Sequence, residues 1–294
     1  MNAKTVTMRA HAKINLTLDI VGRRPDGYHD LVMVMQSVGL CDTVTVTLSD
    51  SGCIAVHTSD ARLADDESNI AYKAARAFFA YAGIEGQGVE IAIEKKIPME
   101  AGMAGGSADG AAVIVALNEL LGTKYADETL WDIGVKVGAD IPFCITGGTM
   151  LAEGKGEILT PLPSLADFPQ PPVILLCKPE IGVSTGRAYA AADKADPASL
   201  RRPDTAAMKR ALAEGNLRGV ADNLVNVFEQ VLPEETAAVI DEIKRTMLHL
   251  GALGACMTGS GTTVFGLFDS AERAEDCAEF LRRTFPKTYL TGAV

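Results

Sequence analysis

Pro98-Met-Glu-Ala-Gly-Met-Ala-Gly-Gly-Ser107 (PMEAGMAGGS) is the stretch that decides the fold. It follows the alternating run Val89–Glu94, which predicts a β-strand, and precedes the apolar run Ser107–Leu121, which predicts a helix. Its three glycines permit positive φ angles and close approach of the backbone, and the helix start adds free amides and a positive dipole end. The strand, loop and helix together predict a site for an anion such as a nucleotide phosphate.

The glycine pattern of this loop is unlike the two common nucleotide-binding patterns. It matches neither GxxxxGK[ST] nor GxGxxG, so neither a P-loop nor a dinucleotide-binding fingerprint is present in it. Taken by itself, the loop is explained equally well as a tight turn that binds nothing. The rest of the sequence must decide between these two interpretations.

The segments around the loop predict a mixture of strands and helices. Alternation in the first 60 residues, for example in Thr43–Leu48, predicts several short antiparallel strands. Ser68–Ala82 predicts a helix that begins behind a Ser or Asn cap and ends at Gly83. Helices are also predicted over 205–214, 217–232 and 234–250, followed by strand character over 251–268 around a second glycine-rich turn. The proline-rich stretch Pro161–Pro172 predicts a break in regular structure. We therefore expect an α+β protein of two domains, 1–155 and 156–294.

Composition limits the classes of partner. The chain has 294 residues, 48% of them hydrophobic, and a formal net charge of −11. This charge repels nucleic acid and anionic membrane surfaces, so an anionic substrate must be held by local donors. The start of the chain has no signal-peptide pattern, no apolar run reaches membrane-spanning length, and the six cysteines form no CxxC pair. We expect a cytoplasmic protein without nucleic-acid or membrane partners and with structural thiols.

Two further segments give the loop its context. Ala12-Lys-Ile-Asn-Leu16 lies near the start and Gly254–Phe265 (GACMTGSGTTVF) near the end, and with the loop they resemble the GHMP kinases in order and spacing. Three more segments, Pro25–His29 (PDGYH), Gly138–Pro142 (GADIP) and Glu153–Glu157 (EGKGE), narrow the resemblance. They are similar to the GHMP kinases that phosphorylate 4-diphosphocytidyl-2-C-methyl-D-erythritol.

This resemblance implies a fold, a reaction and cofactors. The implied fold has an ATP-binding N-terminal domain, a C-terminal domain and a deep cleft between them. The implied reaction is ATP-dependent phosphorylation of the 2-hydroxyl of that substrate, in the non-mevalonate route to isoprenoid precursors. The implied setting is the bacterial cytosol, with a monomer or weak dimer. The implied nucleotide-binding residues are Pro98, Met99, Glu100, Ala101, Gly102, Met103, Ala104, Gly105, Gly106, Ser107 and Ala108.

The resemblance also assigns two catalytic residues. Asp140 in GADIP matches the catalytic aspartate, which accepts or orients the hydroxyl proton, whereas an isolated Asp beside Pro142 would be explained as a turn or helix-cap residue. Lys13 matches the second catalytic position, whereas an isolated lysine on a strand would be read as solvated. The sequence offers no dedicated Mg²⁺ cage, so we expect ATP phosphates and waters to hold the ion, with Ser107 as its protein contact.

The substrate-binding residues implied by the resemblance are Asn15, Tyr28, His29, Thr185 and Tyr189. Tyr28 is expected to stack on the cytosine base, and His29 to satisfy its polar edge from a turn that exposes His29. Asn15 is expected near the acceptor alcohol. Tyr189 is expected on the other face of the base with Thr185 nearby, although a core-packing role for Tyr189 explains the sequence equally well.

The loop departs from the family's usual glycine run at four positions, Glu100, Met103, Ala104 and Ala108. A carboxylate aimed at the triphosphate would repel it, so we expect the Glu100 side chain to turn toward solvent or toward Lys95 or Lys96. Ala104 and Ala108 are expected to alter ATP affinity without abolishing catalysis. Asp109 suits the helix dipole but adds negative charge near the phosphates.

Two other functions compete with this interpretation. Another GHMP kinase, acting on homoserine, mevalonate or a sugar, would keep the loop and Asp140 but should lack the PDGYH segment. A catalytically silent nucleotide-binding protein should have lost Lys13 or Asp140. The sequence keeps the PDGYH segment, Lys13 and Asp140, which argues against both alternatives.

Overall fold

The structure is a computed structural model that describes residues 4–294. The first three residues of the start segment and of the predicted domain 1–155 lie outside the described residues. The chain forms two compact units, each made of several stretches. Unit 1 contains the residues up to Ala12, Leu40–Ile97 and Ala104–Gly147, and unit 2 contains Lys13–Gly39, Pro98–Met103 and Gly148–Val294. A division of the chain at residue 155 stays a prediction.

The strands of unit 1 follow the alternation in the sequence. β1 (Thr5–Arg23) and β2 (His29–Ser49) give residues to both units, and β3 (Ile54–Thr58) and β4 (Gly88–Glu94) belong to unit 1. β2 pairs antiparallel with β4 and β3 pairs parallel with β4. The strands are therefore confirmed, but β1 and β2 are long strands of 19 and 21 residues rather than several short ones, and β3 pairs parallel rather than antiparallel.

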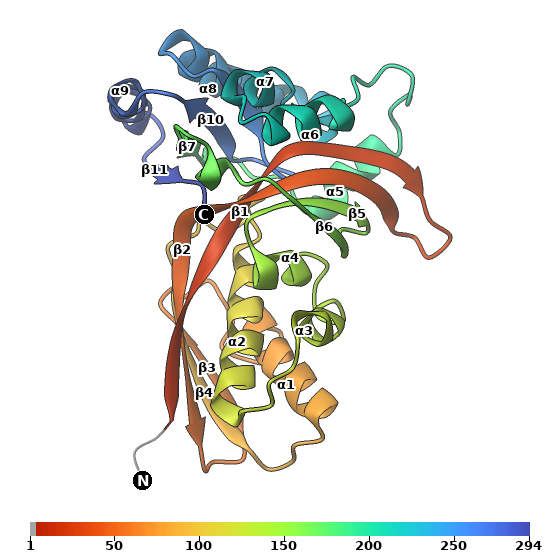
Figure 1. Ribbon diagram of the computed structural model, residues 1–294, viewed down its shortest axis with the longest axis vertical. Coiled ribbons are helices and arrows are strands. Elements are labelled where there is room, and N and C mark those ends of the chain that lie inside the picture. The colour runs from red at the N-terminus through yellow and green to blue at the C-terminus, as the bar shows by residue number, and fades with distance from the viewer. Residues whose placement is uncertain (1–3) are drawn as a thin grey trace. The chain divides into compact units, whose positions relative to one another are not determined.

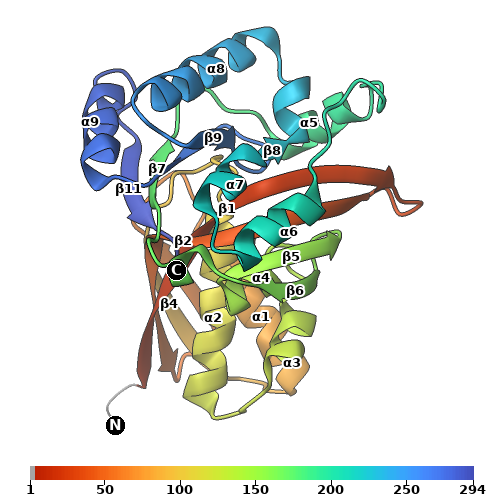
Figure 2. The same ribbon diagram turned by 45° about the horizontal axis from the view of Figure 1, so that its top comes forward.

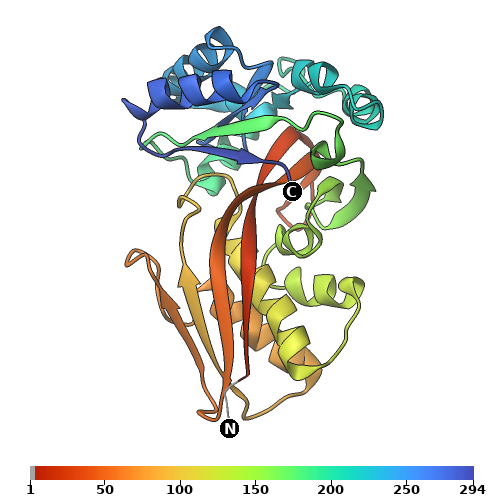
Figure 3. The same cartoon turned by 60° about the vertical axis from the view of Figure 1, so that its left-hand side comes forward.

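The helices of unit 1 are α1 (Ile70–Ala82), α2 (Gly105–Leu121), α3 (Asp127–Gly134) and α4 (Ile141–Thr146). Asn69 caps α1 by accepting a hydrogen bond from the amide of Ala71, and Gly83 ends it at a φ of 65°, as predicted. α2 begins two residues before the predicted start and is largely buried, because its residues are small and apolar. α1 and α2 pack side by side on one face of the unit 1 strands (Figures 1 and 3).

Unit 2 contains the strands that complete the first sheet and a second sheet of its own. β5 (Thr149–Gly154) pairs antiparallel with β2 and with β6 (Ile158–Leu162), and β8 (Val225–Asn226) pairs parallel with β1. The second sheet has the order β11 (Thr288–Gly292), β7 (Val173–Cys177), β10 (Val264–Phe268), β9 (Gly254–Met257), and all its pairs are antiparallel. β9 and β10 confirm the predicted strands around the second glycine-rich turn.

The helices of unit 2 are α5 (Thr185–Ala192), α6 (Thr205–Ala213), α7 (Leu217–Asp222), α8 (Glu234–His249) and α9 (Ala271–Arg282), with short 3-10 helices η1 (Leu165–Asp167) and η2 (Val227–Val231). α8 and α9 pack against the second sheet (Figure 2). The mixture of helices and sheets confirms the predicted α+β class. Along residues 4–294, every helix is too short or too polar to cross a membrane.

One local prediction is wrong, and the predicted break over Pro161–Pro172 holds except at its first two residues. The helix predicted over 217–232 ends at Asp222 and is followed by β8 and η2. Asn226 explains the break, because its buried amide donates to the carbonyl oxygens of Met257 and Gly259 and accepts from the amide of Phe228, bonds that a helical position does not offer. The break begins later than predicted, because Pro161 lies inside β6. Among the strands of residues 4–294, β6 pairs with β5 alone, and an edge strand tolerates a residue without an N–H.

Candidate active site

The predicted phosphate loop connects β4 to α2, and its residues fall in both units. Pro98–Met103 belongs to unit 2 and Ala104–Ala108 to unit 1. The backbone takes left-handed φ angles of 50° at Glu100, 71° at Gly102 and 57° at Ala104. The chain therefore turns repeatedly before the first amides of α2, which is the backbone form that an anion-binding loop requires.

In unit 2 the loop rests on the glycine-rich turn that joins β9 to β10. A Cβ atom at Gly102 would lie 2.2 Å from the carbonyl oxygen of Thr258, and one at Gly259 would lie 2.6 Å from the carbonyl oxygen of Gly102. The amide of Lys13 donates to the carbonyl oxygen of Met103 at 3.2 Å. Three segments that are far apart in the sequence, AKINL, the loop and the C-terminal turn, thus meet in unit 2.

Lys13 is buried with its ammonium group held by a neighbour on the same strand. The side chain of Lys13 is 5% exposed, and its Nζ donates to Oδ1 of Asn15 at 2.8 Å. The same Oδ1 accepts from the amide of Gly259 at 3.0 Å and from Oγ1 of Thr258 at 3.2 Å. A solvated strand lysine is therefore excluded. Asn15 is fully buried, and its side-chain oxygen orients Lys13 and the turn.

Asp140 lies in unit 1, immediately before α4. It occupies the N-cap position, but its side chain accepts no hydrogen bond from the helix, so the helix-cap explanation of this residue is wrong. The GADIP segment packs on the start of α2, since a Cβ atom at Gly138 would lie 3.6 Å from Oγ of Ser107. Unit 1 thus places the segment of Asp140 beside the Ser107 hydroxyl at the start of α2.

The carboxylates of Glu100, in the loop, and of Asp109, in α2, have different surroundings. Glu100 is exposed, as predicted, and its carboxylate lies beside Gly182 in unit 2. Asp109 is buried, and its Oδ2 accepts from Nζ of Lys95 at 2.6 Å. Burial raises the pKa of Asp109, and the ammonium of Lys95 opposes this shift.

The left-handed backbone at Ala104 yields a stability prediction. An L-residue in this region is strained relative to glycine, so Ala104→Gly should raise the free energy of unfolding by about 0.5–1 kcal/mol. Ala108→Gly is the matched control, because Ala108 lies inside α2 and the same change there should lower the free energy of unfolding by about 1 kcal/mol or more. Urea denaturation of both variants measures the difference. A destabilised Ala104→Gly variant would contradict the strain argument.

In unit 2, His29 and Tyr189 are brought together. Their rings stack with centroids 4.6 Å apart, and the ring of Phe228 packs edge-on against Tyr189 at 5.0 Å. Nε2 of His29 lies 2.7 Å from Oδ1 of Asp193. The side chain of His29 is only 9% exposed, so the predicted exposure of this side chain is wrong: Tyr189 and Asp193 cover it.

Tyr28 and Thr185 have other neighbours in the same unit. Tyr28 is 59% exposed, and Nζ of Lys155 lies 4.2 Å from the centroid of its ring. Lys155 comes from the EGKGE turn between β5 and β6 and also pairs with Asp26 at 3.0 Å. Oγ1 of Thr185 lies 3.1 Å from Oγ of Ser260. Thr185 is therefore held at the C-terminal glycine-rich turn.

Sequence reasoning missed three residues of this region. Oγ1 of Thr258 bonds to Asn15 and to the carbonyl oxygen of Gly102 in the loop. The side chain of Asn226 donates to the carbonyl oxygen of Gly259 in the C-terminal turn, and Asp193 bonds to His29. Thr258 lies within the glycine-rich motif and was within reach of the sequence argument. Asn226 and Asp193 lie in segments with no motif, and no signal in a single sequence marks them.

No group of three or more His, Cys, Asp or Glu side chains that could hold a metal ion occurs among residues 4–294.

Comparison with known proteins identifies the family. The chain matches the GHMP kinases N terminal domain over residues 69–148 and the GHMP kinases C terminal domain over residues 200–287. The 4-diphosphocytidyl-2-C-methyl-D-erythritol kinase of Acetivibrio thermocellus is 43% identical over 291 residues, covering 99% of this chain and 100% of that protein. The kinase of the same name from Clostridium acetobutylicum is 40% identical over 289 residues, covering 98% and 100%.

Solved structures agree with this assignment. A crystal structure of 4-(cytidine 5'-diphospho)-2C-methyl-D-erythritol kinase superposes with a TM-score of 0.80 at 31% identity, covering 98% of this chain and 99% of that one. Homoserine kinase from Cytophaga hutchinsonii superposes with a TM-score of 0.75 at 21% identity over 99% and 94% of the two chains, which shows the fold alone. The chain therefore belongs to the 4-diphosphocytidyl-2-C-methyl-D-erythritol kinase family of the GHMP kinases.

Proposed function

We propose that this chain transfers the γ-phosphoryl group of ATP to the 2-hydroxyl of 4-diphosphocytidyl-2-C-methyl-D-erythritol, giving the 2-phosphate and ADP in the non-mevalonate route to isoprenoid precursors. The observation that carries the proposal is the identity of 43% with a kinase of that name, which extends over 99% of this chain. The presence of Lys13, Asp140 and the glycine-rich loop supports a working enzyme rather than a silent binding protein.

The reaction needs in-line attack of the hydroxyl oxygen on the γ-phosphorus. The bond from the γ-phosphorus to its bridging oxygen breaks, ADP leaves, and the hydroxyl proton passes to a carboxylate, for which we assign Asp140. The Asp140 side chain is free of helix capping, which leaves its oxygens available for this proton. The ammonium of Lys13, oriented by Asn15, would offset the charge of the transferring group.

The loop and the start of α2 would hold the triphosphate through their backbone amides. The fit of Mg²⁺ to these residues rests on Ser107, whose hydroxyl lies beside Gly138 in unit 1 and is an oxygen donor of the kind that the ion accepts. Mg²⁺ would neutralise phosphate charge, with ATP oxygens and waters as its remaining ligands. The nearby carboxylate of Asp109 faces Lys95 and is engaged elsewhere.

We assign the cytidine end of the substrate to Tyr28, His29 and Tyr189 of unit 2. Base stacking on an aromatic ring contributes about 1–3 kcal/mol, so Tyr189→Ala should raise the KM for the cytidyl substrate about 10-fold or more and leave the KM for ATP unchanged. Tyr81→Ala is the control, since Tyr81 is an exposed aromatic residue of α1. Steady-state kinetics measure both constants. An unchanged KM for the cytidyl substrate would assign Tyr189 to core packing.

The proposed function is tested by ADP release from ATP and Mg²⁺ with four acceptors: the cytidyl substrate, homoserine, mevalonate and galactose. Turnover confined to the cytidyl substrate is the expected result. Turnover with another alcohol alone would refute the substrate while the reaction type stands. Silence with all four would favour a nucleotide-binding protein without catalysis.

A further inference from the structure

Three charged side chains form a buried network in unit 1 behind the phosphate loop. Lys95 follows β4, Asp42 lies on β2 and Asp109 lies on α2, and their side chains are 7%, 0% and 5% exposed. Nζ of Lys95 pairs with Oδ2 of Asp42 and with Oδ2 of Asp109, the latter at 2.6 Å. One cation therefore joins a strand of the sheet to the helix that begins the predicted anion site.

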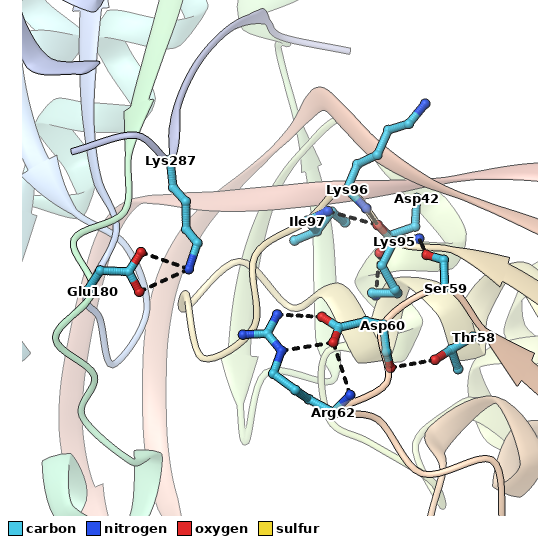
Figure 4. Close-up of polar contacts among 10 residues, drawn as sticks. All are labelled: Asp42, Thr58, Ser59, Asp60, Arg62, Lys95, Lys96, Ile97, Glu180 and Lys287. Atoms are coloured by element: carbon cyan, nitrogen blue, oxygen red, sulfur yellow. Dashed lines mark hydrogen bonds and ion pairs between the residues drawn. The ribbon is translucent and has the colours of Figure 1, made fainter. Parts of the chain in front are cut away.

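Asp42 also fixes the backbone that leads into the loop. Its Oδ1 accepts from the amides of Lys96 and Ile97, the latter at 2.8 Å, while the amide of Lys95 donates to Oγ of Ser59 at 2.9 Å (Figure 4). Three successive amides are thus held by side chains immediately before Pro98. The entry to the loop has a fixed position relative to β2.

The far end of the loop in unit 1 rests on the same network. A Cβ atom at Gly105, the first residue of α2, would lie 3.6 Å from Nζ of Lys95 and 3.0 Å from Cγ2 of Ile97. The start of α2 therefore lies against Lys95, which also bonds to Asp109 of the same helix. Lys95 and Ile97, which precede the loop, both lie beside Gly105, the first residue of α2.

Stabilisation of the fold does not by itself explain why this network is buried. Burial of three charged groups carries a desolvation cost that the ion pairs only partly offset, and well-packed apolar residues often do as well. Among residues 4–294, Oδ1 of Asp109 has no hydrogen-bond partner. What the network provides and apolar packing does not is a directional link between two fixed points.

We propose that Lys95 is a positioning residue for the triphosphate of ATP: through Asp42 and Asp109 it fixes the span of the phosphate loop so that the loop amides meet the phosphates. This inference rests on the proposed function for the role of ATP. It assigns Lys95, Asp42 and Asp109 no contact with the substrate and no part in proton transfer.

Paired variants of Asp109 test the proposal. Asp109→Asn keeps an oxygen that accepts the hydrogen bond from Lys95, whereas Asp109→Ala removes it, and both leave the pair between Lys95 and Asp42 in place. Displaced binding groups commonly cost 10- to 100-fold, so Asp109→Ala should weaken ATP binding about 10-fold or more and Asp109→Asn about 2-fold or less. Asp127→Ala, in the exposed first turn of α3, is the matched control and should leave ATP binding unchanged.

The measurement is the Kd of MgATP by calorimetry without acceptor, followed by the KM for ATP and for the cytidyl substrate. A raised Kd and a raised KM for ATP, with an unchanged KM for the cytidyl substrate and rescue by Asp109→Asn, is the expected result. A purely structural role would lower the melting temperature of Asp109→Ala while the folded protein binds ATP normally, and this outcome overturns the proposal.

A second pair of variants, at Lys95, tests the proposal if the Asp109 variants do not fold. Lys95→Arg keeps the cation and should bind ATP better than Lys95→Met, which leaves two buried carboxylates unpaired and should be less stable. Wild-type protein that binds ATP but phosphorylates none of the four alcohols would refute the proposed function and leave the test of Lys95 intact. Wild-type protein that does not bind ATP overturns both.

Discussion

Asp140→Asn is expected to lower kcat by about 10²–10⁴-fold, because an amide cannot accept the hydroxyl proton and a positioned general base contributes about this factor. The KM values for both substrates should change little, since the amide has the same shape. The fold should be unaffected, because the carboxylate of Asp140 caps no helix and the substitution removes no helix-stabilising hydrogen bond. Steady-state ADP release measures kcat, and thermal unfolding checks the fold.

Asp132→Asn is the matched control for this experiment. Asp132 is an exposed aspartate of α3 in the same unit, so its kcat should equal that of the wild type. A folded Asp140→Asn variant with undiminished kcat would remove Asp140 from proton transfer. A loss in both variants would point to a general effect of charge rather than to the catalytic role.

The elements that the sequence predicts well are those with local causes. α1 has its cap at Asn69 and its stop at Gly83, and β4 follows the alternation of Val89–Glu94. The phosphate loop is marked by its glycines and by the strand and helix on either side. Each of these depends on residues within a few positions of one another, which a single sequence displays.

The contacts that complete the site have no local cause. Asn15 meets Thr258 across 243 residues, His29 meets Asp193 across 164, and Lys95 meets Asp42 across 53. Motif order predicts that AKINL and the C-terminal turn serve one site, but it does not reveal which atoms bond. Asn15 illustrates the limit: the resemblance places it near the substrate, whereas the structure binds its side-chain oxygen to Lys13, Thr258 and Gly259.

The helix predicted over 217–232 fails for a related reason. Its apolar spacing suits a helix, and only the buried partners of Asn226, in the turn between β9 and β10, make a strand and a 3-10 helix more favourable there. The bounds of the two compact units also have no local cause, because each unit combines distant stretches of chain. Local pattern predicts the helix over 217–232, while long-range hydrogen bonds decide that it ends at Asp222.

Gly102→Ala is expected to abolish measurable ATP binding or weaken it about 100-fold or more, because small displacements of binding groups have effects of this size. The added methyl group would lie 2.2 Å from the carbonyl oxygen of Thr258, a backbone atom that cannot rotate away. The loop would have to lift from the turn. Met103, which accepts a hydrogen bond from the amide of Lys13, would move with it.

Gly83→Ala separates this clash from ordinary backbone strain. Gly83 has a φ of 65°, close to the 71° of Gly102, but a Cβ atom there would meet nothing within 4 Å. Both variants should lose about 1–2 kcal/mol of stability from the left-handed backbone, and only Gly102→Ala should lose ATP binding. Calorimetric titration with MgATP and urea denaturation give the two quantities. If Gly102→Ala binds ATP as tightly as Gly83→Ala, the contact between the loop and the C-terminal turn is not needed for nucleotide binding, and the turn supports only the position of Lys13.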